Sequence, residues 1–131
     1  MKSATHSVTI DASPETVFAF VSQPQNMPRW AVRFCRGIRR DGDRWIASTP
    51  NGDMEVVMES DARVGVVDFH WRPSAEVEAV APARVVPNGG GTEFLLTLFQ
   101  SPGMSDVDFD TGQAGLRHEL NVLKELLEQS T

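Results

Sequence analysis

Few polar side chains of this sequence stand where they could act on a small molecule. Arg36 and Thr49 alternate in phase with apolar neighbours in predicted strands, and Gln113 falls on the apolar stripe of a predicted helix. An enzyme acting on a small molecule needs an acid or base with a suitable pKa, or donors aimed at negative charge that develops in the reaction. The chain has no tyrosine to act as a phenol donor. No catalytic set can be named from these residues.

The three histidines do not form a catalytic or metal-binding pattern. His6 lies in the first predicted strand, His70 shares a strand face with Asp68 and Arg72, and His118 stands opposite the apolar helix stripe. We expect each of them at the surface. Asp68 and His70 could supply two metal ligands, but a zinc site needs at least three protein ligands. We therefore expect no metal.

Three other short motifs carry little chemistry. Residues 106–112 ("DVDFDTG") resemble a calcium loop, but the glycine comes one position late and Arg117 stands where the bidentate glutamate belongs. These acids are better explained as favouring a helix N-terminus. The glycines at 89–91 lie between strands and not before a helix, which indicates a turn and no phosphate cradle. Cys35 stands alone, and we expect no cofactor.

Length and composition favour one soluble globular domain over residues 1–131. The formal net charge of −6 argues against nucleic-acid binding through phosphate neutralisation. No apolar run approaches the ~20 residues that a membrane-spanning helix needs. A single cysteine excludes an internal disulfide, and with no export signal the expected location is the cytoplasm.

Half of the twelve basic residues are concentrated between positions 29 and 44. They are Arg29, Arg33, Arg36, Arg39, Arg40 and Arg44. One interpretation is a solvated strand face that pairs with nearby acids such as Glu55, Glu59 and Asp61. The other is an anion-attracting mouth or a surface that contacts a partner protein.

The first third of the chain predicts a strand followed at once by a broken helix. Residues 4–11 contain β-branched residues in weak alternation, typical of a strand. Ser13 is a good helix cap and Pro14 suits the first helical position. Pro24 is expected to end this helix, leaving room for one short helical turn before Trp30.

The middle of the chain changes to a period of two and predicts an antiparallel meander. With the first strand, seven strands are expected, at 4–11, 33–40, 43–49, 53–63, 65–73, 75–86 and 92–100. Their short connections favour antiparallel pairing. Pro82 cannot donate to a ladder and suggests an edge strand or a bulge. Whether such an edge pairs across a homodimer stays open.

Residues 105–129 predict one long amphipathic helix. Its stripe consists of Phe109, Gly112, Gln113, Leu116, Leu120, Leu123 and Leu127. The short first helix cannot bury this stripe alone, so we expect the long helix to lie across the concave face of a curved sheet. The small residues Gly112, Ala114 and Gly115 either allow close contact with the sheet or leave space for a ligand.

This order of elements resembles the helix-grip fold of the START-like (SRPBCC) superfamily, and within it the polyketide cyclase/dehydrase-like proteins. The resemblance rests on "VTIDASPETVFAFVSQPQNMPRW" (8–30), "GDRWIASTPNGDM" (42–54) and "GLRHELNVLKELLE" (115–128). It implies an α+β fold in which a seven-stranded curved antiparallel sheet wraps around the C-terminal helix. Two short helices between strands 1 and 2 would grip one end of an apolar cavity.

The cavity implied by this resemblance gives the candidate site. The side chains expected to line it are Trp30, Phe34, Trp45, Met54, Met58, Phe69, Trp71, Phe94, Leu96, Phe109, Gln113, Leu116 and Leu120. A lining rich in Met and aromatic residues suits adaptable apolar binding, although each residue could instead be ordinary core. The leading hypothesis is binding of a hydrophobic small molecule, such as a lipid, an isoprenoid or a polyketide-like compound. The alternatives are a polyketide cyclase/dehydrase-type enzyme and a protein-interaction module that uses residues 29–44.

Overall fold

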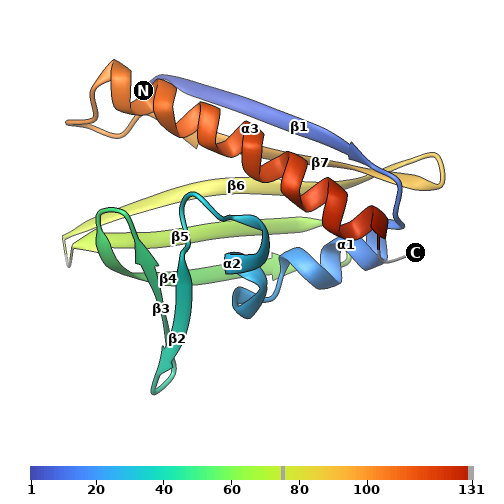
Figure 1. The fold of residues 1–131 in the computed structure, drawn as a ribbon, viewed down its shortest axis with the longest axis horizontal. Coiled ribbons are helices and arrows are strands. Elements are labelled where there is room, and N and C mark those ends of the chain that lie inside the picture. Colours follow the sequence, from blue (N-terminus) through green and yellow to red (C-terminus); the bar gives the residue numbers. More distant parts are fainter. Residues whose placement is uncertain (75, 130–131) are drawn as a thin grey trace.

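The structure, a computed structural model, describes residues 1–74 and 76–129. Its elements are β1 (Ser3–Ile10), α1 (Pro14–Val21), η1 (Pro24–Asn26), α2 (Met27–Trp30), β2 (Gly37–Asp41), β3 (Arg44–Thr49), β4 (Gly52–Asp61), β5 (Val66–Ser74), β6 (Val77–Asn88), β7 (Gly91–Phe99) and α3 (Asp106–Gln129) (Figure 1). The strands form one antiparallel sheet in the order β1-β7-β6-β5-β4-β3-β2. This confirms the predicted helix-grip fold, with a curved seven-stranded sheet, a long C-terminal helix and short helices between β1 and β2.

The first helix begins where the sequence predicts it. The Thr16 backbone N–H donates to the Ser13 side-chain oxygen at 3.2 Å, and Pro14 takes the first helical position. The helix also ends before Pro24, as predicted: α1 stops at Val21, and Pro24 opens η1, since proline fits the first turn of a helix. The chain then continues into α2 and places Trp30 at its end.

The predicted strand at 33–40 is too long at its start. Strand β2 begins only at Gly37, and residues 31–36 form a loop between α2 and the sheet. The backbone N–H groups of Arg33 and Phe34 donate to the Glu119 carboxylate of α3, which removes them from any strand ladder. A distant side chain thus decides where the strand starts.

The prediction that Pro82 marks an edge strand or a bulge is wrong for β6 as a whole, although Pro82 lies in the part of β6 that has no β7 partner. Strand β6 is interior, between β5 and β7, and the irregularity in its pairing lies near Trp71 and Ser74 of β5. Pro82 is tolerated because β7 pairs with β6 only between Ala83 and Asn88. Residue 82 is therefore just outside this ladder, although both strands continue. The missing N–H therefore interrupts no ladder bond to β7.

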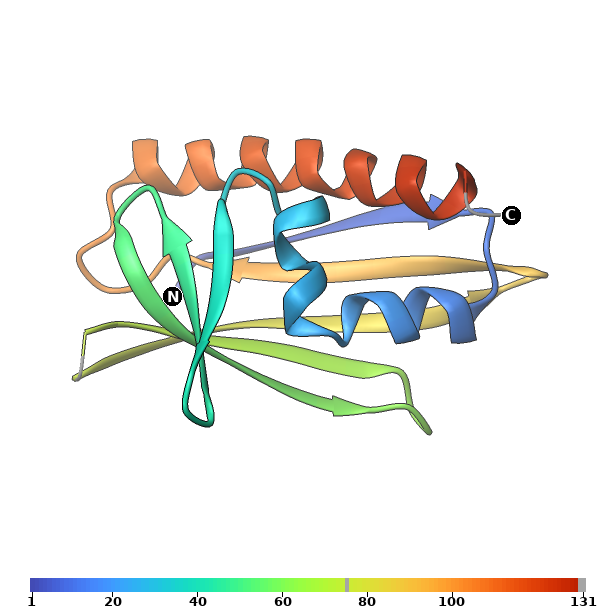
Figure 2. The same cartoon turned by 60° about the horizontal axis from the view of Figure 1, so that its bottom comes forward.

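The strand register gathers large apolar side chains on the sheet face that carries the helices (Figure 2). One row across β3 to β6 consists of Trp45, Val56, Trp71 and Ala79. The next row consists of Met58, Phe69 and Ala81. Because side chains alternate across a strand, both rows belong to the same face.

The helix α3 packs through its apolar stripe, with two differences from the prediction. Its buried residues are Phe109, Gly115, Leu116, Glu119, Leu120, Leu123 and Leu127. Gly112 is exposed and Gln113 is half-buried, so the buried stripe takes in Gly115 and Glu119 instead. The helix runs next to β1 on the concave side, not across the middle strands, and α2 lies against its other flank. The expected position of the long helix on the concave face is confirmed, and the structure adds that it lies near the β1 edge of the sheet.

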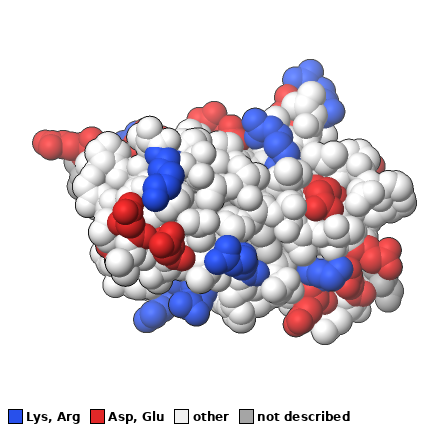
Figure 3. Space-filling view, turned by 90° about the horizontal axis from the view of Figure 1, so that it is seen from above, with Lys and Arg blue, Asp and Glu red and all other residues white. Residues whose placement is uncertain are grey.

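The arginines of residues 29–44 mostly engage their neighbours. Arg39 pairs with Asp53 at 3.1 Å and Arg44 with Glu55 at 3.0 Å, so the expected pairing with Glu55 is confirmed. Two further acids expected to pair with this cluster contact other residues: Glu59 lies 3.6 Å from His70, and Asp61 pairs with Arg63. Figure 3 shows one face of the molecule, on which basic and acidic side chains are scattered in small groups between wide uncharged areas.

Candidate functional site

Three of the predicted lining residues meet in an aromatic cluster beneath α2. The Trp30 ring lies 6.0 Å from the Phe69 ring and 6.0 Å from the Phe94 ring, both in edge-to-face geometry. All three side chains are buried. Such pairs stabilise a fold by about 0.5–1.5 kcal/mol beyond their buried area. The end of the broken helical connection is therefore anchored in the interior between β5 and β7.

The indole N–H of Trp30 has no hydrogen-bond partner among the described residues. The residue is only 2% exposed, so this donor is separated from bulk water. An indole nitrogen can donate but not accept, so only an acceptor atom can satisfy it. A buried polar group without a partner is costly, and each such case in a native structure calls for an explanation.

A second aromatic pair lies nearer the surface, between the loop of residues 31–36 and strand β5. The rings of Phe34 and Trp71 are 5.5 Å apart in edge-to-face geometry, and both side chains are half-buried. Glu119 holds this loop, because one carboxylate oxygen, Oε2, accepts the backbone N–H groups of Arg33 and Phe34, each at 3.0 Å. The loop thereby places Phe34 against Trp71.

Glu119 is a buried acid that the sequence reasoning missed. Burial raises the pKa of its carboxyl above the usual value, and the N–H donors of Phe34 and Arg33 lower it in part. The available signal was its position three residues after Leu116, on the buried stripe of the helix. Burial also raises the pKa of the nearby Cys35 thiol to about 11, so this thiol stays protonated and unreactive at neutral pH.

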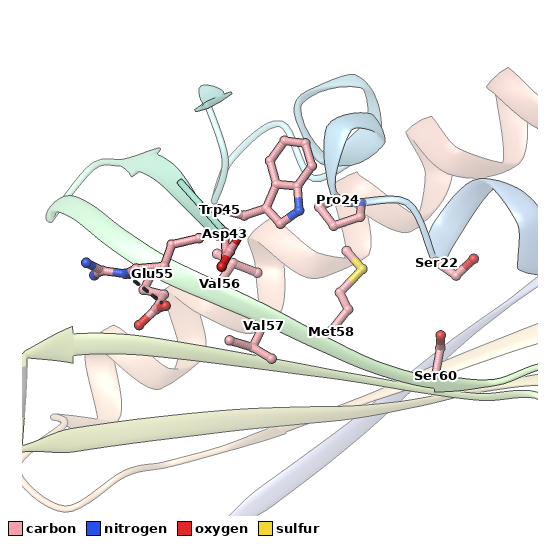
Figure 4. A pocket seen from close by; sticks show the side chains of 10 residues that line it. Ser22, Pro24, Asp43, Trp45, Glu55, Val56, Val57, Met58 and Ser60 are labelled. Carbon is pink, nitrogen blue, oxygen red and sulfur yellow. Dashed lines mark hydrogen bonds and ion pairs between the residues drawn. The ribbon is translucent and has the colours of Figure 1, made fainter. Parts of the chain in front are cut away.

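Two further predicted residues, Trp45 and Met58, line a surface pocket of about 230 Å³ (Figure 4). Val56 and Pro24 complete its apolar wall. Ser22, Asp43, Arg44, Glu55, Val57 and Ser60 line the remainder. The last residue pair between β3 and β4 on this side is Trp45–Val56. The part of β4 after Val56 therefore has no partner on its β3 side, and the pocket opens there. The Arg40 guanidinium lies over the Trp45 ring at 5.1 Å.

The remaining predicted residues lie elsewhere in the interior. The aliphatic side chains of this group, which are Met54, Leu96, Leu116 and Leu120, are buried. Phe109 is buried near the start of α3, with the Lys2 ammonium 5.7 Å from its ring. Gln113 accepts a hydrogen bond from His6 at 3.1 Å and contacts no residue of the aromatic cluster. Which of these side chains contact a ligand stays a prediction.

The polar candidates from the sequence do not converge on the interior. The Thr49 hydroxyl donates to the Gly52 carbonyl at 2.7 Å within the β3–β4 turn. Arg36 is exposed, and His70 contacts Glu78 at 3.1 Å. Across residues 1–74 and 76–129, His, Cys, Asp and Glu side chains form no group of three or more that could hold a metal. In the same part of the chain, no helix has the length and apolarity needed to cross a bilayer.

Comparison with known proteins assigns the family. The family model described as "Polyketide cyclase / dehydrase and lipid transport" matches residues 1–128. The chain belongs to this family. No curated protein shows significant sequence similarity to it. The START-like resemblance stated from the sequence is thereby confirmed, and the family supports a ligand-binding or cyclase-type role.

Solved structures share the fold at low sequence identity. A protein of Mesorhizobium loti has a TM-score of 0.78 and 14% identity, with 99% of each chain covered. The di-domain ARO/CYC protein BexL of the BE-7585A biosynthetic pathway has a TM-score of 0.73 and 20% identity, covering 95% of this chain and 46% of that one. The Aha1 dimer of Colwellia psychrerythraea has a TM-score of 0.75 and 14% identity, covering 98% and 97%.

Proposed function

We propose that this member of the family binds an apolar or aromatic small molecule that carries an oxygen acceptor. Lipids, isoprenoids and polyketide-like compounds belong to this class. The binding site is the concave side of the sheet, between the strands, α2 and α3. The protein acts there as a single domain over residues 1–131, in the cytoplasm.

The observation that carries the proposal is the unpartnered indole N–H of Trp30 inside an aromatic environment. The Phe69 and Phe94 rings beside it offer apolar contact. A ligand that is mostly carbon but carries a carbonyl, ether or hydroxyl oxygen satisfies both features at once, as expected of sites that combine apolar walls with a few polar groups. A pure hydrocarbon would leave the donor unsatisfied.

The small residues of β6 support the location. Ala79, Ala81 and Ala83 face the same side as the large residues Trp71, Phe69 and Val67 of β5, to which they are directly opposite. Ala81 and Ala83 are buried, whereas Ala79 is half-buried beside Trp71. Small side chains in the middle of a sheet take up little space beside the neighbouring aromatic rings, which supports a ligand site next to them.

The test compares the affinities of two ligands of nearly equal shape, 1-acetylnaphthalene and 1-ethylnaphthalene, by isothermal titration calorimetry. One neutral hydrogen bond contributes about 1 kcal/mol, so the wild-type protein should prefer the ketone roughly five-fold. Trp30→Phe keeps the aromatic packing, removes the donor and should abolish the preference.

Trp45→Phe is the matched control, because it removes an indole from the same sheet face, and the pocket that Trp45 lines does not include Trp30 (Figure 4). It should keep the ketone preference of the wild-type protein. A preference that survives in Trp30→Phe would contradict the proposed role of the indole N–H. If neither naphthalene binds the wild-type protein, the binding proposal itself is wrong.

A cyclase- or dehydrase-type enzyme is the second candidate, and Glu119 favours it. Among the described residues it is the one acid in the buried set, and its raised pKa makes its carboxylate a stronger base than an exposed one. Both backbone donors bond to Oε2, and neither contacts Oε1. Faster cyclisation of a poly-β-ketone with the wild-type protein than without it, lost in Glu119→Gln while binding persists, would support this candidate. Binding without any acceleration would exclude it.

A further inference from the structure

The free edge of β1 is covered by α3 along part of its length. The Lys124 ammonium donates to the Thr9 carbonyl at 2.7 Å, and the Asp11 N–H donates to the Glu128 carboxylate at 2.9 Å. The opposite edge of β1 pairs with β7. Because alternate residues of a strand turn their backbone groups to the same edge, Ser7 also faces the free edge.

A pocket of about 220 Å³ opens between β1 and α3, next to this covered stretch. It is lined by His6, Ser7, Val8, Arg117, Leu120 and Asn121. Along α3 it lies between the Gln113–His6 hydrogen bond and the Lys124–Thr9 hydrogen bond. Only Val8 and Leu120 are apolar, so the other four residues make this pocket polar.

Arg117 is the charged group of the pocket, and its charge is not neutralised. Its guanidinium has neither an ion pair nor a hydrogen bond to any described residue, unlike Arg39, Arg44 and Arg84, which pair with acids. Its neighbours one helical turn away are positions 113, 114, 120 and 121, none of which is charged. A small anion therefore meets one positive charge with no competing acid on the adjacent turns.

The hydrogen bonds around His6 also keep the nearest acid away from the pocket. The Gln113 amide nitrogen donates to the Asp110 carboxylate at 3.4 Å, which leaves the Gln113 oxygen to accept. The His6 Nε2–H therefore donates to that oxygen at 3.1 Å. Asp110 bonds to Gln113, and the next acid along α3, Glu119, is buried against the 31–36 loop.

We propose that this pocket is a binding site for a small anion, a carboxylate or a phosphate group. The Arg117 guanidinium supplies the charge and a planar pair of donors that matches either group. The Asn121 amide and the hydroxyl and free-edge N–H of Ser7 supply neutral donors. The site is separate from the aromatic cluster of the proposed function, since the two share no residue, so either can fail without the other.

The test is an amide NMR titration of the whole chain with sodium phosphate and, separately, sodium acetate. Sodium chloride holds the ionic strength constant and serves as the reference anion, because charge contacts at a surface are screened by salt. We expect saturable shifts centred on Ser7 and Asn121. The anion that binds more tightly identifies the source of the negative group.

Arg117→Gln should weaken this binding at least ten-fold, and Asn121→Ala should weaken it less. Arg36→Gln is the control, because Arg36 is also exposed and has no ion pair in the described structure. It removes the same charge elsewhere and should leave the affinity unchanged. Equal weakening in the two arginine variants would show a general charge effect and overturn the site. The absence of saturable shifts with both anions would overturn it as well.

Discussion

At the scale of single residues, the least predictable feature is the acid at position 119. A glutamate in a helix is normally assigned to the solvent face, and its position three residues after Leu116 was the only signal against that assignment. Its burial depends on two backbone N–H groups from residues 33 and 34, which lie 86 and 85 positions away in the chain. Sequence periodicity carries no information on such partners, whereas the apolar residues Leu116 and Leu120 were correctly placed on the buried stripe.

Replacement of Glu119 by Gln should change how stability depends on pH. Because the folded-state pKa is raised, the contribution of Glu119 to stability is complete below its ordinary value of 4.5 and is lost as pH rises through the folded-state pKa. Gln cannot ionise, so the free energy of unfolding of Glu119→Gln should rise relative to the wild type across that window. Urea unfolding at several pH values measures this difference. If the free energy of unfolding of Glu119→Gln relative to the wild type stays constant or falls as pH rises, the raised pKa of Glu119 is contradicted.

Two glycines should respond in opposite ways to alanine. A Cβ on Gly115 would lie 3.6 Å from the Arg33 Cβ, which is ordinary contact, so Gly115→Ala should stabilise the helix by up to about 1 kcal/mol. Gly65 has φ +69°, and a Cβ there would collide with the Val85 carbonyl oxygen. Gly65→Ala should cost more than about 1 kcal/mol. Thermal unfolding of both variants checks the pair. A loss of stability in Gly115→Ala would show that α3 needs closer contact at this position.

At the scale of elements, local patterns predicted most of the structure. Segments in which apolar and polar residues alternate predicted the positions of all seven strands. The apolar stripe predicted α3, and the predicted first residue differs from the observed one by one position. Two errors arose where the deciding interaction is not local. The 33–36 segment alternates like a strand, but the N–H groups of Arg33 and Phe34 bond to Glu119 of α3, and the N–H of Cys35 bonds to the Ala31 carbonyl. Pro82 looks incompatible with an interior strand, but the ladder to β7 ends just before it.

The docking of α3 should depend on the side chains of its buried stripe. Leu123 is fully buried and belongs to the core, so Leu123→Ala should lower the free energy of unfolding by about 2–5 kcal/mol. Val107 lies on the same helix but is 74% exposed, and Val107→Ala should change stability by less than about 0.5 kcal/mol. Urea unfolding measures both. Similar small effects would mean that the leucine stripe does not anchor the helix.

At the scale of the whole molecule, the curved sheet, α2 and α3 surround an interior that is lined mostly by aromatic and aliphatic side chains. The broken helix between β1 and β2 brings Trp30 into this interior, and the loop after it brings Phe34 over Trp71. The fold could be predicted from the sequence, whereas which side chains line a ligand site stays a prediction. The unpartnered Trp30 donor and the Arg117 pocket could not, because both depend on which neighbours are absent once the chain has folded.

Binding on the concave side is the central claim, and blocking that side tests it most directly. Ala79→Phe places a ring beside Trp71 at a half-buried position, and Ala62→Phe makes the same change in the exposed β4–β5 turn. After confirming similar melting temperatures, we would titrate 1-acetylnaphthalene into both variants and the wild type by isothermal titration calorimetry. Wild type and Ala62→Phe should bind alike, and Ala79→Phe at least ten-fold more weakly. Equal affinity in all three proteins would contradict a ligand site on this face.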